Sequence, residues 1–74
     1  MNAQSIYERL SVSETGSLTY QGRTDDAERW TQFAEKLRPP EQMEAELLIK
    51  ITERHRERQS GLEHVDMVLF KRLR

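Results

Sequence analysis

The sequence predicts a small α+β domain: a short N-terminal helix, one β-hairpin, then two to three helices. Apolar and polar residues alternate around a glycine over residues 10–20, which is typical of a hairpin. Apolar residues recur at helical spacing over residues 25–38 and again over residues 41–59. The chain has 74 residues, 35% of them hydrophobic and 34% charged, so we expect a single domain over residues 1–74.

The first expected element is a short helix over residues 4–10. Ser5 and Glu8 have the spacing of a capping box, in which each side chain bonds the other's backbone N–H. Ile6 and Leu10 would lie on one face of this helix. Because one or two turns of helix are marginal alone, we expect this face to dock on the rest of the protein.

The hairpin is predicted over residues 10–20, with its loop at residues 14–16. Gly16 would adopt the left-handed conformation that closes such a turn. In this register Val12 faces Leu18 and Leu10 faces Tyr20, so all four side chains share one face. A shift by one residue would scatter them over both faces, so the pattern favours this register.

A second helix is expected over residues 25–38, capped by Thr24 or Asp25, with Asp25 and Glu28 at capping-box spacing. Its apolar stripe consists of Ala27, Trp30, Phe33, Ala34 and Leu37. Pro39 and Pro40 would end this helix and form a tight connector. We therefore expect the next helix to pack against it antiparallel or at a steep angle.

The central predicted element is a long helix over residues 40–59, ending at Ser60-Gly61. Its buried stripe would contain Met43, Leu47, Leu48, Ile51 and His55. Beyond Ile51 the apolar content falls and arginines accumulate. The first half of this helix would hold the fold together, and the second half would be exposed.

Residues 62–73 fit two structures. Leu62, Val65, Leu69 and Leu73 form a helical stripe, with Ser60 and Glu63 at capping-box spacing. Alternation of Val65, Met67 and Leu69 instead fits a strand paired with the hairpin. Composition favours a helix, because β-branched residues are outnumbered here. The predicted core of the domain is Leu18, Trp30, Phe33, Leu37, Leu47, Leu48, Ile51 and Leu69.

The sequence contains no recognisable catalytic arrangement, so we do not expect an enzyme. There is no cysteine, and the two histidines, His55 and His64, lack the further ligands of a metal site. The three glycines are too scattered for a phosphate-binding loop, and no cofactor is expected. The N-terminus has no signal-peptide core, and no apolar run reaches membrane-spanning length. We expect a cytoplasmic protein.

Charge is unevenly distributed along the chain. Residues 1–49 carry a net charge of −4 and residues 50–74 carry +3. The candidate partner-binding residues are the basic ones Arg54, Arg56, Arg58, Lys71, Arg72 and Arg74. Arginine suits carboxylates and phosphates alike. Glu53 and Glu57 lie among the arginines and would repel phosphates, and no helix-turn-helix pattern is present, so a protein partner is favoured over nucleic acid.

Two resemblances bear on function. Residues 14–20, ETGSLTY, resemble the "ETG-x-L-x-aromatic" hairpin that opens phage-borne HNH nucleases. The His-Asn-His pattern of those enzymes is missing, so this resemblance implies a mobile-element origin and no nuclease activity. In size, arginine content and hairpin, the chain resembles small bacteriophage regulatory proteins. One family of these binds host RNA polymerase and inhibits or antiterminates transcription.

The leading functional hypothesis is a small regulatory protein that occupies a surface of a bacterial protein machine, with RNA polymerase as the first candidate. One alternative is nucleic-acid binding through the basic C-terminal part. Another is a structural or oligomeric phage protein, with Ile49, Met67 and Phe70 making a self-contact.

Overall fold

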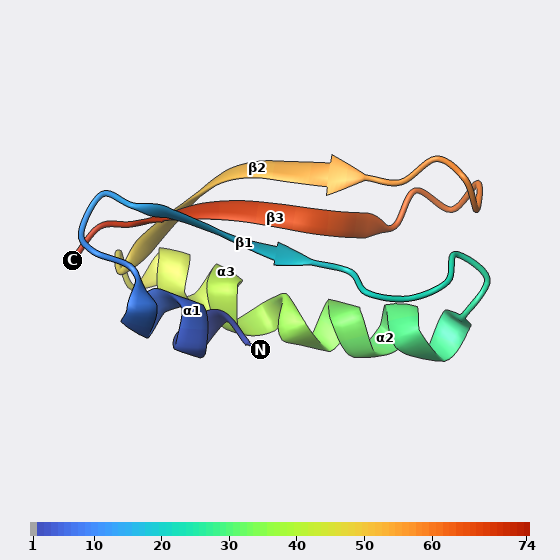
Figure 1. The fold of residues 1–74 in the computed structure, drawn as a ribbon, viewed down its shortest axis with the longest axis horizontal. Coiled ribbons are helices and arrows are strands. Elements are labelled where there is room, and N and C mark those ends of the chain that lie inside the picture. Colours follow the sequence, from blue (N-terminus) through green and yellow to red (C-terminus); the bar gives the residue numbers. More distant parts are fainter. Residues whose placement is uncertain (1) are drawn as a thin grey trace.

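The computed structural model describes residues 2–74, and Met1, the first residue of the predicted domain, lies outside them. Three helices lie against one face of a three-stranded antiparallel sheet (Figure 1). The α+β class is confirmed, but the kinds and order of the elements differ from the prediction. They are α1 (Ala3–Arg9), β1 (Thr15–Thr19), α2 (Ala27–Lys36), α3 (Arg38–Ala45), β2 (Ile49–Arg56) and β3 (Val65–Arg72).

The predicted N-terminal helix is confirmed, although its cap is not Ser5. The Asn2 side chain caps α1 by accepting a hydrogen bond from the Ser5 N–H at 2.8 Å. Ala3 is fully buried, and Ile6 and Leu10 pack against the core. Docking of this apolar face supplies the stability that seven residues of helix lack on their own.

The prediction of a local hairpin over residues 10–20 is wrong, because β1 pairs with β3 at the far end of the chain. Leu18 lies opposite Val68 in this register, and both side chains are buried. Residues 11–14 instead form a turn in which Ser13 has a positive φ of 75°. Pairing with β3 places β1 on a sheet that the helices cover, whereas a local hairpin would leave Leu18 on an isolated pair of strands.

Gly16 is also explained differently. It lies inside β1, and a Cβ atom added to it would sit 2.7 Å from Cγ2 of Ile6 and 3.0 Å from Cδ1 of Leu10. The glycine therefore allows α1 to approach the strand closely, rather than allowing a left-handed turn.

The second helix is confirmed with shifted ends, because Asp26 rather than Thr24 or Asp25 caps α2. Its side chain accepts a hydrogen bond from the Arg29 N–H at 3.0 Å. Pro39 and Pro40 fall in the first turn of α3, where proline is tolerated. The two helices consequently continue as one bent helix (Figure 1), and the expected antiparallel or steep packing is wrong.

The predicted long helix over residues 40–59 is wrong, because α3 ends at Ala45. Leu47 adopts a left-handed φ of 63°, its N–H donates to the Glu44 carbonyl and the Leu48 N–H donates to the Met43 carbonyl, each at 3.0 Å. These two bonds define a Schellman motif, which satisfies the last carbonyls of a helix. Glycine usually occupies the left-handed position, so the sequence carries no visible stop signal here.

Residues 49–56 form strand β2 instead of continuing the helix. Ile49, Ile51 and Thr52 are β-branched and fit a pleated strand better than a helix. Ile49 is almost completely buried and Ile51 packs against the core. Register shifts between Ile51 and Glu53, and between His55 and Arg56, interrupt the regular pairing with β3.

The prediction of a helix over residues 62–73 is wrong. The alternative prediction of a strand is confirmed for most of this range, because Val65–Arg72 form β3. β3 is the central strand of the sheet, with β1 and β2 on either side. Val68 and Phe70 are buried beneath the helices. The strand exchanges hydrogen bonds on both edges, which outweighs the modest helical propensity of its residues.

The predicted core is partly confirmed. Leu18, Trp30 and Phe33 are buried, and Leu37, Leu48 and Ile51 pack partly buried against the core. Leu47 is wrong, because it lies 58% exposed at the helix terminus. Leu69 is only partly buried, on the opposite face of the sheet. The other buried apolar residues among residues 2–74 are Ala3, Pro40, Met43, Ile49, Val68 and Phe70.

An aromatic stack joins α2 to the loops at the far end of the sheet. The Trp30 ring lies between Tyr20, with centroids 3.7 Å apart, and His64, with centroids 4.4 Å apart. The indole N–H of Trp30 donates to the Thr24 carbonyl at 3.0 Å. Both faces and the polar edge of the indole are therefore satisfied within the protein, which makes Trp30 a structural residue.

A buried carboxylate organises the loop between β2 and β3. Glu57 accepts hydrogen bonds from the N–H and hydroxyl of Ser60 and from the His64 N–H. The hydroxyl bond and then the N–H bond of Ser60 hold the pKa of Glu57 below its usual value of 4.5. Since the carboxylate is paired three times, burying it fixes the loop geometry.

Candidate protein-binding surface

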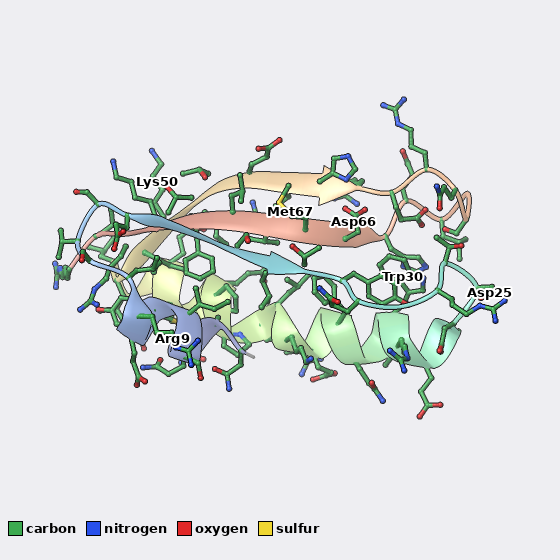
Figure 2. The ribbon with its side chains drawn as sticks, in the orientation of Figure 1. Arg9, Asp25, Trp30, Lys50, Asp66 and Met67 are labelled. Atoms are coloured by element: carbon green, nitrogen blue, oxygen red, sulfur yellow. The ribbon has the colours of Figure 1, made fainter. Side chains whose placement is uncertain are left out.

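Among residues 2–74, no helix lies on one of the two faces of the sheet. Side chains alternate along each strand, and the register places those of Leu18, Val68, Phe70 and Ile49 on the helix-covered side. The opposite side, which we call the uncovered face, is formed by Thr15, Ser17, Thr19, Met67, Leu69, Lys71, Lys50, Glu53 and His55. Figure 2 shows Lys50 and Met67 on the side of the sheet away from the helices.

The centre of the uncovered face is apolar and its margins are polar. Met67 and Leu69 lie on the central strand β3 and are both partly exposed. Ser17 and Thr19 lie opposite them on β1, and Glu53 and His55 lie opposite on β2. An exposed apolar centre with a polar rim is the common arrangement of a protein interface.

Two lysines face each other across β2 and β3 at one end of this face. Lys50 is the direct cross-strand partner of Lys71, and Thr15 completes the row on β1. Directly opposite residues have Cβ atoms roughly 5 Å apart, so like charges in such a pair reduce stability. A carboxylate bound between the two ammonium groups would turn this repulsion into attraction.

The other end of the uncovered face carries a histidine fixed by an aspartate. Nδ1 of His55 lies 2.7 Å from Oδ1 of Asp66, and the His55 side chain is about twice as exposed, 58% against 28%. This contact orients the ring and leaves Nε2 free to contact a partner. A groove of about 500 Å³ beside it is lined by His55 and Met67 together with Tyr20 and Arg58.

The structure does not bring the six predicted partner-binding residues together. Arg56 pairs with Val65, whereas Lys71 lies six residues further along β3, roughly 20 Å away at strand spacing. Arg54 and Arg56 line a small cavity on the helix side of β2. Arg54 also lies 3.9 Å from Glu41 of α3. Arg58 lies in the loop after β2 and lines the groove beside His55.

The three C-terminal basic residues differ from one another. Lys71 lies on the uncovered face. The Arg72 guanidinium donates to the carbonyls of Tyr7 at 3.1 Å and Leu10 at 2.6 Å, and lies 4.3 Å from the centroid of the Tyr7 ring. The Arg74 carbonyl accepts from the Tyr7 hydroxyl at 2.7 Å. Arg72 therefore ties α1 to the sheet, while partner binding by the other five stays a prediction.

Sequence reasoning missed Lys50, and it assigned Met67 to a self-contact and Leu69 to the core, whereas both are partly exposed on the uncovered face. Met67 and Leu69 carried a signal, since their alternation with Val65 fits a strand and places them on one face with Lys71. Lys50 carried no local signal, because its position opposite Lys71 depends on the pairing of two strands. The self-contact hypothesis is wrong for Ile49 and Phe70, which are buried within the chain's own core.

Residues 2–74 contain neither a metal-binding cluster nor a membrane-spanning helix. Within this range no group of three or more His, Asp or Glu side chains is arranged to hold a metal ion. None of the helices described is long and apolar enough to cross a membrane. Comparisons with protein-family models, curated proteins and solved structures found no match to this chain.

Proposed function

We propose that this protein is a small binding module that recognises an acidic surface of a protein partner through the uncovered face. The observation that carries the proposal is the opposed pair Lys50 and Lys71, next to the partly exposed Met67 and Leu69. A like-charged pair reduces the stability of the free protein, so its presence fits a contact in which both charges are compensated.

The composition of the uncovered face favours a protein over a nucleic acid. Proteins that hold single strands on an open sheet stack bases on exposed aromatic rings. The nine residues of the uncovered face include no such ring except the imidazole of His55. Glu53 on this face and Asp66 beside it would repel a phosphate backbone that runs along the face, whereas a protein carboxylate can contact the lysine pair at one end alone.

The first partner to test is bacterial RNA polymerase. This choice rests on the resemblance to small phage regulatory proteins that inhibit or antiterminate transcription. Occupying an acidic surface of such a machine requires no catalytic group, so a compact chain with one binding face suffices for this role.

The test compares two variants with the same loss of positive charge. Lys50→Gln/Lys71→Gln removes the pair, whereas Arg9→Gln/Arg38→Gln removes two exposed charges from the helices. Figure 2 shows Arg9 on α1, on the side of the molecule away from the uncovered face, and Arg38 is the first residue of α3. Affinity for purified RNA polymerase is measured by biolayer interferometry. We expect at least a tenfold loss for the lysine variant and little change for the arginine variant.

Stability distinguishes a binding role from a structural role of the lysine pair. Removing the like-charge repulsion should raise the free energy of unfolding by about 0.2–1 kcal/mol, although binding weakens. An equal loss of binding in both variants would overturn the assignment to the uncovered face. Absence of binding to polymerase would remove that partner, and retention on DNA that weakens steeply with salt would favour the nucleic-acid alternative.

A further inference from the structure

The outer edge of β1 is free to accept another strand. The Tyr20 N–H donates to the Asp66 carbonyl at 2.7 Å and the Arg72 N–H donates to the Glu14 carbonyl at 3.0 Å, which fixes the phase of the β1–β3 ladder. Backbone groups alternate in direction along a strand, so those of Thr15, Ser17 and Thr19 point away from β3. Among residues 2–74, these three N–H groups make no hydrogen bond to a neighbouring element.

The outer edge of β2, on the other side of the sheet, is protected against the addition of a strand, whereas the outer edge of β1 is not. The Ile51 N–H at the outer edge of β2 donates to the Glu44 carboxylate at 2.8 Å. Two register shifts and a series of charged side chains also interrupt β2. Proteins use these devices to prevent unwanted strand pairing. The TGSLT sequence of β1 contains no proline or charged residue, and its ladder has no register shift.

A groove runs alongside this open edge, between β1 and α2. It has a volume of about 460 Å³ and is lined on one side by Ser17, Leu18 and Thr19. Its other side is a stripe of α2 residues at i, i+3, i+4 and i+7, namely Arg29, Gln32, Phe33 and Lys36. A strand placed beside β1 would therefore lie over a helix surface on which Arg29, Gln32 and Lys36 are exposed and Phe33 is mostly buried. Ile6 of α1 also lines this groove.

We propose that an extended, acidic segment of a protein partner adds to the sheet as a fourth strand beside β1, above α2. About five residues of the segment would match the length of β1, roughly 17 Å at strand spacing. Its backbone bonds Thr15, Ser17 and Thr19. Alternate side chains face the groove, an apolar one over Phe33 and carboxylates towards Lys36 and Arg29.

Charge argues that the occupant is not a second copy of this chain. Pairing β1 with β1 of another copy would bring the basic stripes of two α2 helices to face each other. Arg29 is partly compensated by Asp26 at 3.4 Å and by the Gln21 carbonyl at 3.1 Å. Lys36 forms none of the ion pairs found among residues 2–74, so it is the cation best placed for a partner carboxylate.

This edge surface does not depend on the uncovered face, so the two proposals fail separately. The probe for the edge is the capped synthetic hexapeptide Glu-Thr-Val-Thr-Glu-Thr, in which Glu, Val and Glu alternate on one side. Its counterpart replaces both Glu by Lys. Binding is followed by NMR titration of the backbone amides of the intact protein.

We expect the acidic probe to shift the amides of Thr15, Ser17 and Thr19 and to slow their exchange with solvent. In the free protein these three amides should exchange faster than those of Leu18 and Tyr20, which face β3. Slow exchange of all three in the free protein, or no shift at millimolar acidic probe, would overturn the proposal.

Two further variants test the geometry. Lys36→Glu should weaken binding of the acidic probe at least tenfold and favour the lysine probe, whereas the exposed Arg38→Glu should change neither. Ser17→Pro removes an outward N–H and is compatible with an edge strand, so it should abolish binding. If Ser17→Pro unfolds the protein, an acidic probe that is N-methylated at the backbone positions facing β1 replaces the variant. Undiminished binding of this methylated probe would overturn the proposal.

Self-association is measured by sedimentation of the wild type over a range of concentrations. A monomer at all concentrations supports a foreign strand as the occupant. A concentration-dependent dimer that Ser17→Pro converts to a monomer would overturn this assignment and identify a second copy on the edge.

Discussion

At the scale of single residues, Arg72 shows how one basic side chain can belong to the fold while its neighbours face solvent. Its guanidinium reaches two carbonyls at the end of α1, those of Tyr7 and Leu10, and its Nε donates to the Arg74 carbonyl at 2.6 Å. The planar fork of arginine suits several acceptors at once. Charge alone could not distinguish Arg72 from Lys71 in the sequence, because the difference depends on which face of β3 each occupies.

Arg72→Lys should therefore destabilise the protein although it keeps the charge. A lysine cannot bond all three carbonyls or lie flat against the Tyr7 ring, so we expect a loss of about 1–3 kcal/mol in the free energy of unfolding. Urea denaturation measures this loss, and hydrogen exchange should show faster opening of α1. Arg9→Lys, on the exposed side of α1, is the matched control and should stay within about 0.5 kcal/mol of the wild type.

At the scale of elements, the largest departure from expectation is the end of α3. The helical pattern continues through Leu47, Leu48 and Ile51 with no glycine or proline, and the β-branched residues 49, 51 and 52 are the one local sign of a strand. The chain nevertheless turns at Leu47, because the strand that follows buries Ile49 and pairs with β3. The end of the helix therefore depends on pairing with residues more than fifteen positions away, so periodicity within residues 40–59 could not reveal where the helix ends.

Leu47→Gly should stabilise the protein. The left-handed conformation costs a residue with a side chain roughly 1–2 kcal/mol, and Leu47 is too exposed to lose much packing. After the entropy cost of a glycine, we expect a net gain of about 1 kcal/mol, or a Tm rise of roughly 4–8 °C.

Leu62→Gly is the control for this substitution. Leu62 is a similarly exposed leucine in a loop, and its φ is not positive. Glycine there removes no strain, so thermal unfolding followed by circular dichroism should show no gain. A Leu47→Gly protein that melts at or below the wild-type temperature would contradict the Schellman interpretation.

At the scale of the whole molecule, helices α1 and α2 and the class of fold were predictable, whereas the sheet was not. Both helices carry local caps and an apolar face that the sequence displays, as around Trp30 and Phe33. The sheet instead joins β1 to β3, about fifty residues apart, and no local pattern encodes that pairing. The same holds for the candidate surface. Lys71 could be identified from the sequence as a binding residue, but its position opposite Lys50 could not, because that position depends on the pairing of distant strands.

Two carboxylates hold turns at opposite ends of the molecule, and their pKa values link global stability to pH. Glu14 bonds the N–H of Ser11 in the turn before β1, and this bond is the main reason that the pKa of Glu14 lies below 4.5. Glu57 does the same for the loop between β2 and β3 through Ser60. A carboxyl group whose pKa is lower in the folded state stabilises the protein above its unfolded pKa.

The free energy of unfolding should therefore be constant above about pH 5 and should fall as the pH passes through the lowered pKa values of both groups. The variant Glu14→Gln/Glu57→Gln should be less stable than the wild type at pH 7, and the gap should narrow as the pH falls through the lowered pKa values and the wild-type carboxylates become protonated. Urea denaturation at each pH measures both curves. Glu53→Gln, an exposed change on the uncovered face, should keep the acid dependence of the wild type. A double variant that retains the full fall below pH 5 would show that other groups carry it.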